Sequence, residues 1–144
     1  MNPLKHILVL PQWYPNKTDI QLGGFIQQQV NLISGHFKAS VIYVQPILNQ
    51  ESMFEMDVVE RNNITEYIVY YKQSTGVFRR FINLTRFKKA QKLAFARIET
   101  KIDLCHIHVP LRCSLLALSL NKNIPIIITE HWSGHLSGAF NTLQ

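Results

Sequence analysis

The chain has 144 residues, carries a formal net charge of +6, and is 47% hydrophobic and 17% charged. This size favours one domain with a core of its own. No apolar run approaches the roughly 18 residues that a membrane-spanning helix needs, and the two cysteines, Cys105 and Cys113, are too few for a disulfide framework. Because the first residues lack a signal-peptide pattern, we expect a cytoplasmic protein with reduced thiols.

The first third of the chain predicts a β-α-β unit. Residues 5–10 form an apolar strand without alternation, which is typical of a parallel sheet covered on both faces. Residues 24–33 follow the pair Gly23 and Gly24 and have the spacing of an amphipathic helix, with Gly35 in its C-cap region. Residues 41–44 predict a second buried strand that ends at Pro46.

The middle of the chain predicts a hairpin, or two adjacent short strands, followed by a long helix. Asn62 and Asn63 separate strand candidates at 57–60 and 64–71, and the alternation in the second indicates one partly exposed face. Apolar residues recur at helical spacing from residue 77 to about residue 98, with a break expected near Asn83.

The last third predicts a strand at 104–108, a helix at 111–120 and another buried strand at 126–129. Strands and helices therefore alternate around one hairpin. This order predicts an α/β fold, a Rossmann-like open and mostly parallel sheet with helices on both faces, in a single domain over residues 1–144.

Ligands of such sheets bind beyond the carboxyl ends of the strands, at the point where strand order reverses. We expect residues 13–24, 106–110 and 130–135 to meet there. His106 and His108 share one strand face, and His131 directly follows a strand. The helix that begins after Gly23 offers unpaired N–H groups to an anion. Two plainer interpretations stay open: the glycines shape a turn, and His106 is a core histidine.

Metal and thiol chemistry are disfavoured by the same pattern. Strand alternation places Cys105 on the face opposite His106 and His108, and a glycine interrupts any helical pairing of His131 with His135. Cys105 lies in a buried strand and Cys113 in a helix, where thiols are usually inert. We therefore expect neither a metal site nor a cysteine nucleophile.

Four motifs, taken in order, resemble the N-terminal half of family 4 glycosyltransferases of the GT-B type, particularly bacterial members. The resemblance extends across essentially the whole chain, and the hairpin and the cationic helix are its variable middle. The motifs are Trp13-Tyr14-Pro15, Gly23-Gly24-Phe25-Ile26-Gln27-Gln28-Gln29, Leu104-Cys105-His106-Ile107-His108 and Pro125-Ile126-Ile127-Ile128-Thr129-Glu130-His131-Trp132.

The resemblance implies roles for individual residues. Gly23 and Gly24 would approach the diphosphate of the donor, and His131 would contact the donor sugar or assist catalysis. The remaining candidates would border the cleft or stack on sugar: His106, His108, Trp13, Tyr14 and Trp132. For the aromatic residues, anchoring of the loop is the alternative interpretation.

The resemblance also implies the reaction: retaining transfer of a sugar from a nucleotide sugar to a glycan or lipid-linked acceptor, without metal or cofactor. Family members have a second Rossmann-like domain that binds most of the nucleotide. We therefore expect this chain to be an acceptor-side fragment that is inactive alone, because donor and acceptor must be clamped in one cleft. The alternatives are a non-catalytic module that binds an anion or nucleotide, and an epimerase-like GT-B protein.

Eight cationic residues and a single acid, Glu99, lie between residues 79 and 101. A solvated helix accounts for this pattern, and so does contact with anionic lipid at the inner face of the membrane. Nucleic-acid binding would also satisfy the charge, but no recognition motif accompanies it, so we expect no nucleic-acid partner.

Overall fold

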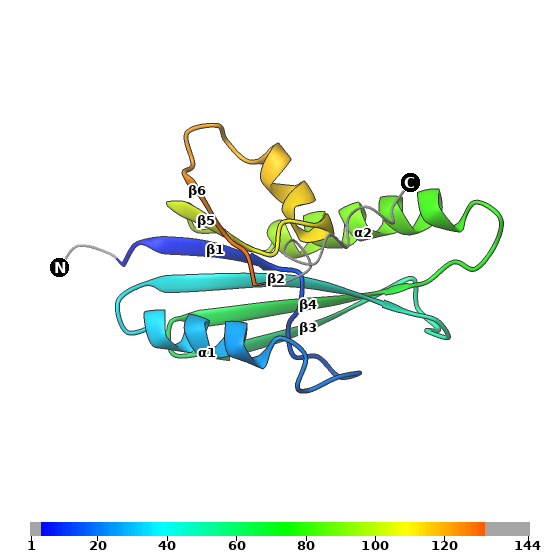
Figure 1. Ribbon diagram of the computed structural model, residues 1–144, viewed down its shortest axis with the longest axis horizontal. Coiled ribbons are helices and arrows are strands. Elements are labelled where there is room, and N and C mark those ends of the chain that lie inside the picture. Colours follow the sequence, from blue (N-terminus) through cyan, green and yellow to red (C-terminus); the bar gives the residue numbers. More distant parts are fainter. Residues whose placement is uncertain (1–3, 132–144) are drawn as a thin grey trace.

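A computed structural model describes residues 4–131, which form one six-stranded sheet with helices on both faces (Figure 1). The strands are β1 (His6–Pro11), β2 (Lys38–Ile47), β3 (Phe54–Arg61), β4 (Ile64–Lys72), β5 (Leu104–His108) and β6 (Ile126–Thr129). The helices are α1 (Gly24–Ile33), α2 (Arg79–Phe95) and the 3-10 helix η1 (Arg112–Ser119). Within this part of the chain, no helix combines the length and apolarity that crossing a bilayer would need.

The strand order is β3-β4-β2-β1-β5-β6, and every neighbouring pair is parallel except the β3–β4 hairpin. From β1 the chain first builds outward through β2 and β4, and then returns to the other side of β1 to add β5 and β6. Strand order therefore reverses between β1 and β5. This topology confirms the predicted Rossmann-like α/β fold.

Two apolar cores lie on opposite faces of the sheet, and β1 contributes to both. Leu8 and Leu10 face the core that α2 and η1 cover, whereas Ile7 and Val9 face the core under α1. Figure 1 shows α1 on one side of the sheet and α2 with η1 on the other. Because both faces are covered, all six residues of β1 are buried, which accounts for the unalternating apolar run in the sequence.

The hairpin is confirmed, but one expectation about it was wrong. Asn62 makes the turn in the left-handed region, with φ of 49°. The second strand, β4, has no exposed face, because Tyr67 packs in the α2-side core and Ile68 in the α1-side core. The outer strand β3 is the one that meets solvent, through side chains such as Val58.

Strand β2 continues through Pro46 rather than ending there. Pro46 stands in register with Tyr71 of β4, whereas the pairing of β2 with β1 extends only to Val41. A proline lacks the N–H that a sheet interior requires, but Pro46 has a neighbouring strand on one side only.

The helices also differ in detail from the expectations. Helix α2 is unbroken at Asn83, because that side chain bonds the backbone N–H and C=O of Ser74 rather than its own helix. Residues 112–119 form a 3-10 helix, with i→i+3 bonds such as Ser114 N–H to the Leu111 carbonyl. Among the described glycines only Gly23 has a positive φ, so Gly35 is not a left-handed C-cap.

Strand β6 was expected to be buried, and that expectation was wrong. Ile126, Ile127 and Ile128 are each about half exposed, at 49%, 48% and 57%. The reason is position, since β6 is the last strand of the sheet and pairs with β5 on one side. An apolar run predicts a strand, but its burial depends on which elements lie beside it.

A buried carboxylate connects the α1 side of the sheet to the loop after β1. Glu66 on β4 is 3% exposed and accepts hydrogen bonds from the hydroxyl of Tyr14, from Gln27 Nε2 at 3.3 Å, and from the guanidinium of Arg61. Burial, followed by the bond to Glu66, raises the pKa of Tyr14, so its hydroxyl stays protonated and donates. Glu66 thereby connects α1 and the β3–β4 hairpin to the loop that follows β1.

Replacing Tyr14 by Phe removes one donor from this buried carboxylate. We expect the free energy of unfolding to fall by about 1.5–3 kcal/mol, the range for hydrogen bonds to charged groups. Urea denaturation measures the change. The matched control is Tyr43→Phe, because that hydroxyl donates to the neutral Gln45 Oε1 at 2.6 Å and should cost about 0.5–1.5 kcal/mol. Equal losses in the two variants would contradict the central role of Glu66.

Candidate functional site

The reversal point between β1 and β5 is the place where this fold offers a ligand crevice. Backbone hydrogen bonds connect the carboxyl ends of three strands there. The N–H of Gln12, after β1, donates to the carbonyl of His108 at 3.0 Å, and the N–H of Val109 donates to the carbonyl of Thr129 at 2.9 Å. The ends of β1, β5 and β6 are therefore fixed relative to one another.

Three histidines gather at this edge. His108 Nδ1 and His131 Nε2 are 3.0 Å apart in a hydrogen bond, and the two rings are nearly parallel, at 4°. The ring of His106 lies 4.0 Å from that of His108, centroid to centroid, and its Nε2 is 2.8 Å from the hydroxyl oxygen of Thr129. In a bond between two imidazoles one ring accepts, so at least one of His108 and His131 is neutral.

Burial keeps two of these rings uncharged. Desolvation, with smaller contributions from His106 and His131, lowers the pKa of His108 to about 3. Desolvation and then the neighbouring His131 lower the pKa of His106. Near neutral pH these imidazoles each keep a lone pair on one nitrogen, so each can accept a hydrogen bond.

The start of α1 reaches the same cluster. The ring of Phe25 meets the ring of His131 edge-on, with centroids 4.8 Å apart, and Phe25 is itself 44% exposed. The helix that the glycine pair opens is therefore in contact with His131, two residues beyond the end of β6. The structure thus brings His106, His108 and His131 together with the first turn of α1.

The backbone conformation at position 23 requires glycine whether or not a ligand binds. It is the N-cap of α1 with φ of 65°, and a Cβ placed there would lie 2.3 Å from the carbonyl oxygen of Trp13. The turn-shaping interpretation therefore accounts for Gly23. Gly24 differs, because a Cβ there would meet nothing within 4 Å, so the space beside it is open. The first turn of α1 contains no acidic residue.

The aromatic candidates are placed differently from one another. Tyr14 is fully buried in the α1-side core and bonded to Glu66, so its ring anchors the loop and presents no face for stacking on a sugar. Trp13 is partly exposed and lies beside Gly23. Trp132 lies outside the described residues, as does His135.

Val109 is a feature of this site that the sequence did not reveal. It directly follows His108, is 1% exposed, and has φ of 61°, a costly conformation for a β-branched residue. Its carbonyl accepts hydrogen bonds from the N–H of Leu111 at 2.8 Å and from Cys113 Sγ at 3.1 Å. Valine is an ordinary strand residue, so nothing in its type indicates a strained turn.

The cysteine thiols lie on the opposite face of the sheet from the rings of His106 and His108. Cys105 and Cys113 belong to the α2-side core, and burial raises the pKa of their thiols to about 12 and about 11. Both thiols are therefore protonated near neutral pH and pack as small apolar groups. Across residues 4–131, no set of three or more His, Cys, Asp or Glu side chains is arranged to hold a metal ion.

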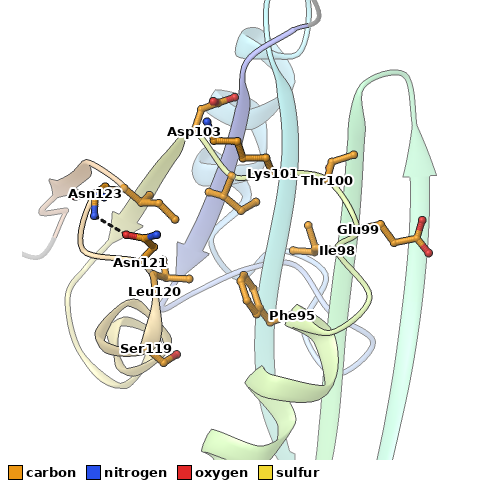
Figure 2. Close-up of a pocket in the computed structure, with 12 residues that line it drawn as sticks. Phe95, Ile98, Glu99, Thr100, Lys101, Asp103, Ser119, Leu120, Asn121 and Asn123 are labelled. Atoms are coloured by element: carbon orange, nitrogen blue, oxygen red, sulfur yellow. Dashed lines mark hydrogen bonds between the residues drawn. The ribbon is translucent and has the colours of Figure 1, made fainter.

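Two hollows border strand β5. One of about 260 Å³ borders the histidines and is lined by His106, His108, Val9, Gln29, Val30, Leu32 and Ile33. A larger one of about 600 Å³ lies at the amino ends of β5 and β6, among segments such as residues 98–103 and 119–124 (Figure 2). We place the candidate site beside the smaller hollow, because His106 and His108 of the imidazole cluster line it together with the second half of α1.

Comparisons of the chain with protein-family models, with curated proteins and with solved structures found no match. The resemblance to family 4 glycosyltransferases therefore stays a prediction that rests on the four motifs.

The two glycines should respond in opposite ways to alanine. Gly23→Ala puts a Cβ into the Trp13 carbonyl at a positive φ, so we expect a loss of at least about 2 kcal/mol in unfolding free energy. Gly24→Ala is its matched control, because the site is open and helical, and we expect no loss or a gain of up to about 1 kcal/mol. Chemical denaturation of both variants measures this. Equal tolerance at the two sites would refute the role given to Gly23.

Stability should depend on pH because the folded protein keeps histidines neutral. The pKa values of His6, His106 and His108 are lowered from 6.5, so between that value and the folded pKa the unfolded chain binds more protons. Stability is therefore complete above about pH 7 and falls as the pH drops. His108 alone should account for about 2 kcal/mol between pH 7 and about pH 5.

Denaturation midpoints measured across this pH range test the effect. We expect His108→Gln to reduce the dependence on pH, with the contributions of His6 and His106 remaining. The exposed His36 supplies the matched control, and His108→Gln should reduce the dependence more than His36→Gln does. An unaltered dependence in His108→Gln would show that His108 is not held neutral.

Proposed function

We propose that this chain is the N-terminal, acceptor-side domain of a retaining glycosyltransferase of the GT-B type. The enzyme transfers a sugar from a nucleotide sugar to a glycan or lipid-linked acceptor, and its biological setting is cell-envelope polysaccharide biosynthesis in the cytoplasm. The observation that carries the proposal is the bond between His131 and His108 together with the contact between His131 and Phe25. It unites three of the four motifs at the reversal point of the sheet.

His131 is the catalytic candidate because it is partly exposed at the crevice, whereas His108 behind it is buried. The neutral His108 orients the His131 ring through their hydrogen bond and is a positioning residue. A fixed imidazole can bond a hydroxyl of the donor sugar or receive a proton during transfer. His106, held by Thr129, lines the adjacent hollow together with His108.

The positive end of the α1 dipole favours the binding of a diphosphate nearby. A helix N-terminus carries about half a positive charge, and here no acid in the first turn opposes it. Gly24 leaves open space at that point, whereas Gly23 shapes the turn that presents it. We propose that α1 forms one wall of the donor site, and that a second Rossmann-like domain supplies the other wall. The proposal requires no metal or cofactor.

A second candidate is a non-catalytic Rossmann-like module that binds some other anion. The observation that favours it is the contact of Gly23 with Trp13, since the glycine that matches the family motif is then explained by the turn alone. The two candidates differ in what they bind, because only the transferase requires a nucleoside diphosphate beside His131.

Isothermal titration of the full-length protein with a panel of nucleoside diphosphates and their sugar conjugates tests the proposal. We expect one nucleotide to bind at micromolar concentration, and its sugar conjugate to lose at least tenfold in affinity in His131→Ala through the lost hydrogen bond. His36→Ala is the matched control, because that histidine is exposed and lies at the other end of α1.

Binding of the panel by neither the parent protein nor the control would overturn the transferase proposal. Binding of inorganic phosphate and of every nucleotide with equal affinity would favour the anion-binding module. Unchanged affinity for the sugar conjugate in His131→Ala would remove His131 from the donor site.

A further inference from the structure

The beginning of α2 exposes apolar side chains next to arginines. Val77, Phe78 and Phe81 are 94%, 74% and 73% exposed, which is unusual for large apolar residues so close together. Arg79 and Arg80 lie between them and are also exposed. We call residues 77–81 the α2 tip.

The tip continues into a row of lysines along the outer side of α2. Lys88 and Lys92 follow Phe81 by seven and eleven residues, so the three share one helical face. The opposite face packs on the sheet and carries the buried residues Asn83, Phe87, Ala90, Gln91 and Ala94. No Asp or Glu occurs anywhere in residues 67–98. The charged side chains of α2 are therefore all cationic, and the exposed apolar side chains gather at its first residues.

Two neighbouring cations, Arg86 and Lys89, already have partners within the protein, so we do not count them as part of this cationic surface. The guanidinium of Arg86 donates to the carbonyl of Lys72 at 2.5 Å, and the ammonium of Lys89 lies over the ring of Phe54. In the described part of the chain, none of the salt bridges involves Arg79, Arg80, Lys88 or Lys92. These four cationic side chains are therefore exposed to solvent and do not stabilise the fold through those ion pairs.

We propose that the α2 tip and the adjacent lysines dock this protein onto an anionic lipid surface. Val77, Phe78 and Phe81 enter the boundary between headgroups and acyl chains, and Arg79, Arg80, Lys88 and Lys92 bind anionic headgroups. Charge complementarity selects this occupant over a second copy of the chain, because two such cationic faces repel. The aliphatic Val77, nearly fully exposed, favours lipid over nucleic acid, since it offers no stacking face for a base.

The α2 tip lies toward the same end of the sheet as the candidate site. Helix α2 follows β4, so its first residues lie toward the carboxyl ends of the parallel strands, the same end of the sheet as the histidines (Figure 1). A membrane bound at the tip therefore lies toward the end of the domain that holds the candidate site. The docking itself does not rest on the transferase proposal, because it follows from the surface of α2 alone.

Co-sedimentation with vesicles tests the inference. We expect the protein to bind vesicles of phosphatidylcholine with about one-third phosphatidylglycerol and to leave vesicles of phosphatidylcholine alone unbound, with binding that weakens as salt rises. The double variant Lys88→Gln with Lys92→Gln should weaken binding about fivefold for each cation removed. Lys5→Gln with Lys122→Gln is the charge-matched control at the other end of the sheet, and we expect it to bind like the parent.

The apolar contribution needs a separate variant. Phe78→Ser with Phe81→Ser should abolish the binding that persists at high salt, at least a tenfold loss, while the circular dichroism of the protein stays unchanged because both side chains are exposed. Equal loss in the lysine control would mean that only net charge matters and would overturn the proposal. So would undiminished vesicle binding in both tip variants, or tighter binding of a DNA or RNA fragment that the same variants abolish. Nucleotide titration of the lysine double variant should match the parent, which separates this test from that of the transferase.

Discussion

The burial of β1 on both faces is the constraint on which the rest of this structure depends. With no side chain of β1 exposed, helices must cover the sheet on each side, and α1 and α2 do so. Strands must also flank β1 on both edges, which β2 and β5 supply. Because β2 and β5 lie on opposite sides of β1, the loops after β1 and β5 lead to helices on opposite faces of the sheet, and this is where the fold offers a ligand crevice.

The chemistry of the histidine cluster follows from the same burial. An isolated imidazole would be partly protonated near neutral pH, but His108 sits under α1 and against β1, where the charged form is poorly solvated. A neutral ring can share a hydrogen bond with His131, which lies nearer to solvent. The core thus fixes the charge of one histidine, and that histidine orients the next.

The two glycines at the start of α1 illustrate how one motif can serve two purposes. Gly23 is required by the backbone of its own loop, whereas a side chain at Gly24 would meet open space. Either residue alone would be read as part of a turn. It is the contact of Phe25 with His131 that connects this turn to the edge of the sheet where ligands of open α/β proteins bind.

The sequence by itself determined the secondary structure and the class of fold, because apolar runs and helical spacing are local properties. It predicted α1 to the residue, the hairpin around Asn62, and the shared face of His106 and His108. It failed where the answer depends on neighbours that are distant in the chain. Ile126–Ile128 have the composition of a buried strand but lie at the sheet edge, and Pro46 continues a strand because one side of β2 is open there. Only the tertiary structure decided that Tyr14 anchors the loop on Glu66, that Val109 is strained, and that His131 meets His108, since each depends on packing between elements far apart in sequence.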